Sequence, residues 1–206
     1  CADYDGSEGF ICLDSALNGE SSIPILPTIE MPSEQIPVFG TDNSDTFVAN
    51  SGFLTSKTII DGENGTDTLN LNLKNSVKNG PVIKNIENLS ISSFGDYSLD
   101  LSNVSDLGYI LSKGSLGTIT LNGLENAVTT FAFSGNGVNS TILTSNDIGG
   151  TADSLNIQLL EAQNVSFQAP LGYEILNIEM NGASSLNYLL ANGISTAKVR
   201  GTGDLA

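Results

Sequence analysis

The amino-acid sequence predicts an all-β protein, and three observations support this fold class. Apolar and polar residues alternate strictly in several short runs, which is the period of a strand with one buried face. The chain holds 22 Gly among many Asn, Ser, Thr and Asp, and only 6% aromatic residues. Such a composition favours short strands joined by tight turns, because Gly and Asn tolerate positive φ. Helical periodicity is weak.

The strands can be placed from this alternation. The clearest runs are Thr68–Leu73, Thr118–Leu121 and Ser154–Leu159. In the first of these, the Leu residues fall on one face and the Asn residues on the other. Further strands are expected in Val82–Ile91 and Tyr173–Met180. A helical turn or two is expected only in Ser98–Leu111 and Ala183–Asn192.

Three segments are expected along the chain. Residues 1–39 carry four of the six prolines and predict an extended strap or linker, since Pro removes a donor and favours extended backbone. Residues 40–146 form the first copy of an internal repeat, and residues 147–206 form a second, incomplete copy. The repeat aligns Asp61–Leu73 with Asp147–Leu159 at an offset of 86 residues.

Cys1 and Cys12 are the only cysteines and lie within the first segment. A disulfide between them would stabilise the chain by about 3 kcal/mol in the loop-entropy model. An unpaired chain end and a lipid-bearing first Cys are the alternatives.

The charge and the missing His exclude several function classes. The chain carries 23 acidic and 7 basic residues, a net charge of -16, which disfavours nucleic acid and anionic membranes as partners. No apolar run approaches the length of about 18 residues that membrane insertion requires. Without His, Ser has no usual general base, and the commonest transition-metal ligand is missing. We therefore expect a non-enzymatic protein.

Two turns carry the pattern of a calcium-binding nonapeptide, G-G-x-G-x-D-x-U-x, in which U is apolar. They are GTDNSDTFV from Gly40 and GENGTDTLN from Gly62. In this pattern the Gly/Asn-rich half turns its carbonyls and the sixth-position Asp toward Ca²⁺, and the apolar residue begins a strand. Calcium needs six to eight hard oxygens, so a second turn must face the first.

These turns, with the strand motif NIENLSI that follows them, resemble the RTX-related module of Gram-negative surface-layer (S-layer) and type I-secreted proteins. The resemblance covers residues 40–91 closely and the remainder weakly. It implies a calcium-stabilised β-solenoid or β-sandwich, export in an unfolded state, and self-assembly at the cell surface. We predict a short parallel β-solenoid of the β-roll or β-helix kind, with β-sandwich units as the alternative.

The sequence departs from a tandem RTX array, because Asp45 and Asp67 lie 22 positions apart with a spacer between them. One or two isolated calcium sites are therefore expected. The candidate ligands are Asp42, Asp45, Asp61, Glu63, Asn64, Asp67, Asp147 and Asp153. Ordinary turn capping is the alternative for these residues and is favoured for Asp147 and Asp153. Glu87 and Glu125 are expected to be solvated residues on a strand face.

The predicted function is structural. The chain is expected to be an extracellular component of a calcium-dependent array on a bacterial cell surface, where it contacts copies of itself and cell-surface polysaccharide. The alternative is a repeat of a large secreted adhesin, in which the same calcium sites stiffen a stalk.

Overall fold

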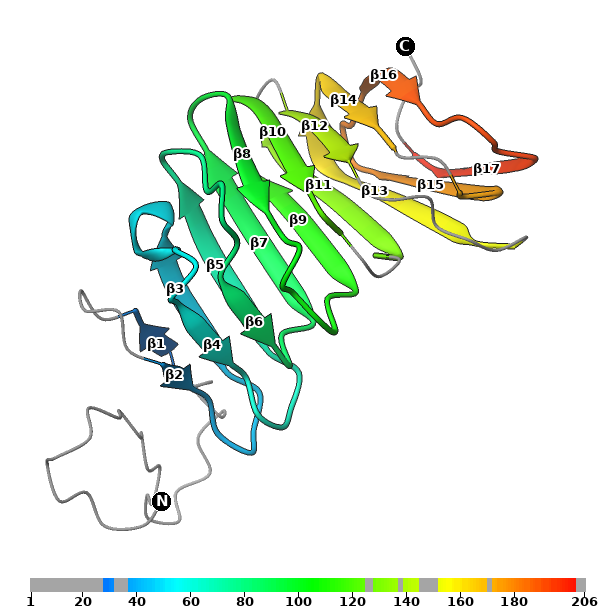
Figure 1. Ribbon diagram of the computed structural model, residues 1–206. Helices are drawn as coiled ribbons and strands as arrows, with labels where there is room; N and C mark the ends of the chain where they lie inside the picture. Colours follow the sequence, from blue (N-terminus) through cyan, green and yellow to red (C-terminus); the bar gives the residue numbers. More distant parts are fainter. Residues whose placement is uncertain are drawn as a thin grey trace, which may run out of the picture.

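The computed structural model describes residues 28–31, 37–124, 128–136, 139–144, 152–169 and 172–202. The chain winds as a parallel β-solenoid, with β1 and β17 at opposite ends of the stack (Figure 1). This confirms the predicted fold, and the alternative of separate β-sandwich units is not what the chain adopts. In these residues no helix is long and apolar enough to cross a membrane.

One wall of the solenoid is a nine-stranded parallel sheet formed by the odd-numbered strands. Its strands are β1 (Thr28–Glu30), β3 (Thr46–Asn50), β5 (Thr68–Leu73), β7 (Asn88–Ser93), β9 (Tyr109–Lys113), β11 (Thr130–Asn136), β13 (Ser154–Gln163), β15 (Ile175–Asn181) and β17 (Thr196–Gly201). Each strand pairs with the next in sequence order, so every turn of the chain adds one strand to this wall.

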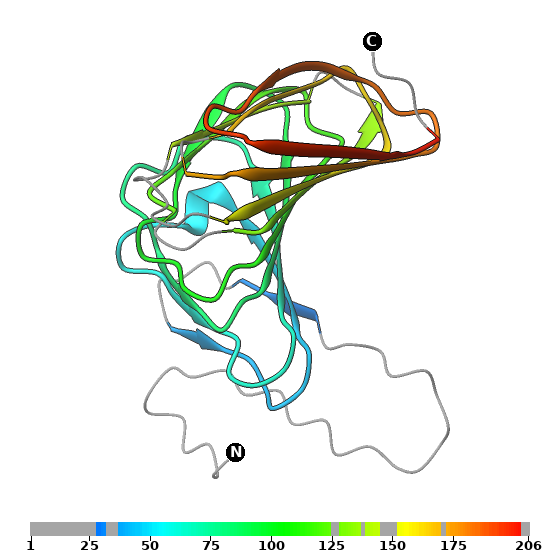
Figure 2. The ribbon, with the colours of Figure 1, turned by 90° about the vertical axis from the view of Figure 1, so that its right-hand side faces the viewer.

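The even-numbered strands form two smaller parallel sheets. The three-stranded sheet holds β2 (Val38–Phe39), β4 (Ile59–Asp61) and β6 (Val82–Lys84). The five-stranded sheet holds β8 (Tyr97–Asp100), β10 (Gly117–Asn122), β12 (Asn139–Thr144), β14 (Val165–Gln168) and β16 (Leu186–Leu190). Single bridges, Val77 to Leu99 and Ile83 to Val104, link the rungs where one sheet gives way to the other. The rungs around β5 and β7 therefore have three sides, which enclose a common core (Figure 2).

The core consists of inward-facing residues stacked in register along the large sheet. Alternation of buried and half-buried residues in β5, as its TLNLNL sequence predicts, places Leu69, Leu71 and Leu73 inside. The longest inward ladder contains Ile29, Phe47, Leu69, Leu89, Ile110, Phe131, Ile157, Ile178 and Val199. All of these are buried except Val199 on the last strand, which is 47% exposed.

Three phenylalanines join the two walls in the later rungs. Phe167 on β14 lies with its ring centroid 5.3 Å from Phe131 and 5.8 Å from Phe133, both on β11. The second pair meets edge to face at 79°, a favoured geometry for aromatic rings. All three are essentially inaccessible to solvent, so this cluster anchors β14 to the large sheet.

The sequence repeat of 86 residues spans several rungs of this stack. By strand pairing, Thr68 lies in one ladder with Asn88, Tyr109, Thr130 and Asn156. The repeat instead aligns Thr68 with Ser154, two residues upstream of its structural partner. The two sequence copies thus belong to one continuous sheet, and the physical repeat is the single rung.

The structure describes residues 28–31 and 37–39 of the predicted strap. Within residues 1–39, β1 pairs with β3 and β2 pairs with β4, so both are strands of the solenoid. Cys1 and Cys12 lie outside the described residues. The Val82–Ile91 run contains two strands, β6 and β7, separated by a corner at Asn85, whose φ is 51°.

The expected helical turns are wrong. Ser98–Leu111 contains parts of β8 and β9, and Ala183–Asn192 contains β16. Parallel pairing with neighbouring rungs overrides the weak local preference in both segments. The described residues contain one short 3-10 helix, at Ser51–Phe53.

Candidate metal centre

Six of the eight predicted calcium ligands lie in two stacked turns. These turns lead from β2 into β3 and from β4 into β5, at the edge where the three-stranded sheet meets the nine-stranded sheet (Figure 1). The six are Asp42, Asp45, Asp61, Glu63, Asn64 and Asp67. Asp153 lies in a later rung, directly before β13. Asp147 lies outside the described residues.

A stack of acidic residues, Asp45, Asp67 and Glu87, occupies the last position before β3, β5 and β7, and we call it the carboxylate corner. The Asp45 amide N–H donates to Asp67 Oδ1 at 2.6 Å. In the same way, the Asp67 amide N–H donates to Glu87 Oε2 at 2.7 Å. Each rung therefore offers a carboxylate oxygen to the backbone of the rung before it.

Other oxygens at this corner are left without a partner. Asp45 is 1% exposed and Asp67 is 0% exposed. Asp45 Oδ2 accepts hydrogen bonds from the Thr41 amide N–H at 2.6 Å and the Thr41 hydroxyl at 3.0 Å. Asp45 Oδ1 and Asp67 Oδ2, in contrast, are buried and accept no hydrogen bond. A buried carboxylate oxygen without a partner is costly, so a positive charge or a proton at the corner would stabilise the folded state.

The pKa of Asp67 reflects this environment. It is raised from 3.8 to about 6, mainly by burial and further by the negative charges of Asp45 and Glu87, and the hydrogen bond from the Asp45 N–H partly offsets this rise. Asp45 and Glu87 carry negative charge, as ionised Asp67 does, so the three carboxylates repel one another. Either a proton or a cation would relieve the repulsion.

Glycines make room for the carboxylates. A Cβ on Gly62 would overlap the Asn85 carbonyl oxygen and lie 2.5 Å from Asp67 Oδ2. A Cβ on Gly40 would overlap the Gly62 carbonyl oxygen and lie 2.7 Å from Asp45 Oδ2. The first Gly of each predicted nonapeptide is thus needed for the close approach of backbone and carboxylate between rungs.

The remaining candidates form a rim around the corner. The Asn64 side-chain amide donates to Asp42 Oδ1 at 2.8 Å, which links the two turns. Asp61 Oδ1 accepts hydrogen bonds from the Asn85 side chain at 2.7 Å and from the Glu63 amide N–H at 3.2 Å. Asp61, like Asp45, therefore caps its own turn, as the alternative to calcium binding predicts.

Glu87 is not the solvated strand-face residue that was expected. It is half-buried, and its carboxylate caps the Asp67 amide. Glu174, which was not a candidate, does the same for the Asp153 amide at 2.9 Å. A signal was present, because each acidic residue directly precedes a strand one rung after another acidic residue in the same place. Glu125 lies outside the described residues.

Asp153 forms a smaller acidic pair in a separate part of the stack. Its Oδ2 is buried without a hydrogen bond. Burial and the charge of Asp153 raise the pKa of Tyr173 to about 12, and the Tyr173 hydroxyl donates to the Val128 carbonyl at 2.9 Å. Asp153 and Glu174 thus form a pair of carboxylates, whereas the carboxylate corner has three.

The donors at the carboxylate corner suit calcium in kind. Carboxylate, amide and carbonyl oxygens are the hard ligands that Ca²⁺ prefers. Across the described residues, however, no three Asp, Glu, Cys or His side chains converge on one point that could hold a metal ion. Calcium binding would therefore require the corner side chains to turn toward a common ion, and the buried oxygens without partners would favour that movement.

The raised pKa of Asp67 predicts an unusual pH dependence. In calcium-free buffer, lowering the pH from about 7.5 to about 5 should stabilise the protein by about 1.4 kcal/mol. The native state binds the Asp67 proton more tightly than the unfolded chain, so stability is gained as the pH falls through about 6 toward 3.8. Urea unfolding at both pH values measures the change. The Asp67→Asn variant should lose this increment, and a wild-type protein that becomes less stable over the same range would contradict the prediction.

Comparison of the chain with protein-family models, with curated proteins and with solved structures finds no match.

Proposed function

We propose that the chain is a calcium-dependent structural module of a bacterial cell-surface array that assembles after secretion. The observation that supports this most directly is the carboxylate corner, where two buried carboxylates each keep an oxygen without a hydrogen-bond partner. Asp45, Asp67 and Glu87 would supply charged ligands, and Asp42 and Asn64 lie on the adjoining rim.

Charge neutralisation is the proposed mechanism. Without an ion, burial and the like charges of Asp45 and Glu87 disfavour the ionised form of Asp67. An ion that binds the native state alone adds about 1.4 kcal/mol for each tenfold excess over its dissociation constant. Low cytosolic calcium would keep the chain unfolded for export, and the calcium of the outside medium would drive folding there.

Calcium titration by isothermal calorimetry tests the ion-binding part. Wild-type protein should bind Ca²⁺, and the Asp45→Asn/Asp67→Asn double variant should not, because both charges at the corner are removed. Asp106→Asn is the matched control, since Asp106 is exposed and its φ of 70° suits Asn as well as Asp. Equal binding by the wild type and the double variant would contradict the assignment.

Electron microscopy of the purified chain tests the array. Two-dimensional order in calcium that disappears with chelator is the expected result. Isolated rods under both conditions would contradict self-assembly and favour the adhesin-stalk alternative, for which a continuous solenoid is also suited.

A further inference from the structure

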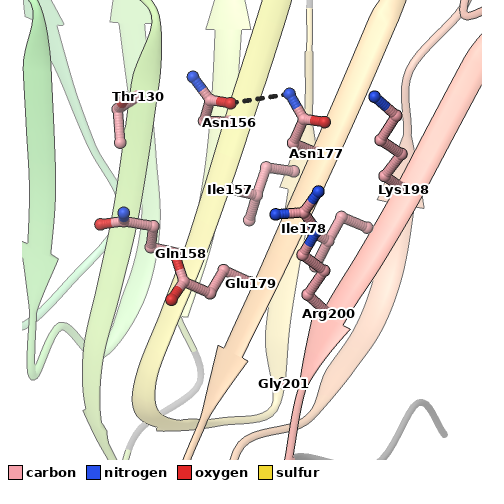
Figure 3. Close-up of a pocket in the computed structure, with 10 residues that line it drawn as sticks. All are labelled: Thr130, Asn156, Ile157, Gln158, Asn177, Ile178, Glu179, Lys198, Arg200 and Gly201. Carbon is pink, nitrogen blue, oxygen red and sulfur yellow. Dashed lines mark hydrogen bonds between the residues drawn. The ribbon is translucent and has the colours of Figure 1, made fainter.

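The outer face of the nine-stranded sheet is hollowed over its last strands. The hollow has a volume of about 540 Å³ and is lined mainly by side chains of β13, β15 and β17 (Figure 3). Its polar residues come in two rows set by the strand register. One row is Asn156, Asn177 and Lys198, and the other is Gln158, Glu179 and Arg200. Because neighbouring strands lie about 4.8 Å apart, each row spans roughly the length of a disaccharide.

Several of these groups are free to bind a ligand. The Asn177 amide donates to Asn156 Oδ1 at 2.9 Å, which fixes the middle of the first row. The side chains of Gln158, Lys198 and Arg200 form no hydrogen bond or ion pair with the described part of the chain. Glu179 is paired with Arg200 in register, yet its side chain extends toward Gln158 (Figure 3). One Glu179 carboxylate oxygen, Oε1, accepts a hydrogen bond from the Asn181 side-chain amide at 3.3 Å. The hollow thus presents donors and acceptors on a rigid sheet.

The side chains that line the hollow carry a net charge of +1 on a strongly acidic protein. Lys198 and Arg200 are two of only seven basic residues in a chain of net charge -16, and Glu179 is the one acidic residue that lines the hollow. The carboxylate corner lies at β3, β5 and β7. Five strand steps separate β5 from β15, about 24 Å, which exceeds the Debye length of about 10 Å at moderate salt. The field of that corner is therefore screened at the hollow.

We propose that this hollow binds a short acidic oligosaccharide. A sugar carboxylate would be held by Arg200 and Lys198, because a guanidinium and an ammonium are the strongest donors to carboxylate. Sugar hydroxyls both donate and accept hydrogen bonds. The Gln158 amide would donate to them and accept from them, and the Glu179 carboxylate would accept from them. An apolar peptide side chain finds no site here, since Ile157 and Ile178 face the core and are buried. The binding does not depend on calcium at the carboxylate corner.

Titration of the purified protein with a galacturonic acid trimer and with the neutral galactose trimer tests this inference. Calorimetry or NMR shifts in calcium-containing buffer should show binding of the acidic trimer, with the neutral trimer weaker by about tenfold or more. The Lys198→Gln/Arg200→Gln variant should lose about tenfold or more in affinity for the acidic trimer. Both positions are exposed on the last strand, so the thermal midpoint should stay close to that of the wild type.

The matched control is Lys74→Gln/Lys78→Gln, which changes the net charge equally at two exposed positions between β5 and β6. It should bind the acidic trimer as the wild type does. Equal binding of both trimers, binding of neither, or equal affinity of the two double variants would overturn the proposal. The comparison of the trimers on wild-type protein needs no variant to fold. Each of these failures would leave the calcium titration, and hence the proposed ion binding, unaffected.

Discussion

Replacing Phe167 by alanine is expected to lower the free energy of unfolding by about 4 kcal/mol. The Phe167 side chain is fully buried and contacts both Phe131 and Phe133 across the core. Its loss would leave a cavity between β14 and β11 that the stacked backbone cannot collapse to fill, because both strands are held by parallel neighbours.

Urea unfolding followed by circular dichroism measures this loss. Phe94→Ala is the control, since Phe94 is 72% exposed and its removal should change stability by less than about 0.5 kcal/mol. If the two variants lost similar stability, Phe167 would not hold the two walls together.

Replacing Gly62 by alanine is expected to cost about 3 kcal/mol. The new methyl group would overlap the Asn85 carbonyl oxygen of the next rung and press on Asp67 Oδ2. Neither can yield easily, because the Gly62 amide N–H donates to the Lys84 carbonyl beside this contact and Asp67 Oδ1 accepts the Asp45 N–H. The rungs would have to separate at the carboxylate corner.

Gly52→Ala provides the matched comparison. A Cβ there meets no atom within 4 Å, and Gly52 is exposed. Thermal melts of the two variants should therefore differ widely in midpoint, with Gly52→Ala close to the wild type. A Gly62→Ala protein as stable as the wild type would show that the turns are not packed against each other as described.

The sequence predicts the strands well because each carries its own periodic signal. Thr68–Leu73 is a strand with the bounds that its alternation predicts. The corners are harder, since a turn such as Asn85 divides a run of apolar residues without interrupting their pattern. The register is harder still. Thr68 pairs with Asn156 through intervening rungs, whereas the repeat aligns it with Ser154, and local similarity does not fix long-range pairing.

The candidate site also has residues that the sequence places correctly and residues that it does not. The turn motifs place Asp45 and Asp67 together, because their spacing equals one rung. The contact of Glu87 with the Asp67 amide is harder to predict, because the sequence around Glu87 alone does not show it and only the comparison of successive rungs does. The hollow over β13, β15 and β17 is not visible in the sequence at all, since Lys198 and Arg200 become its edge only when three rungs stack.

Thermal melts of the wild type and of Asp67→Asn, with calcium and with chelator near pH 7.5, test the central claim most directly. Asn keeps an acceptor for the Asp45 N–H but removes a charge that two like charges repel. In chelator the variant should therefore melt above the wild type. In calcium the order should reverse, because only the wild type retains the charged ligand. A wild-type midpoint that calcium leaves unchanged would contradict calcium binding at the carboxylate corner.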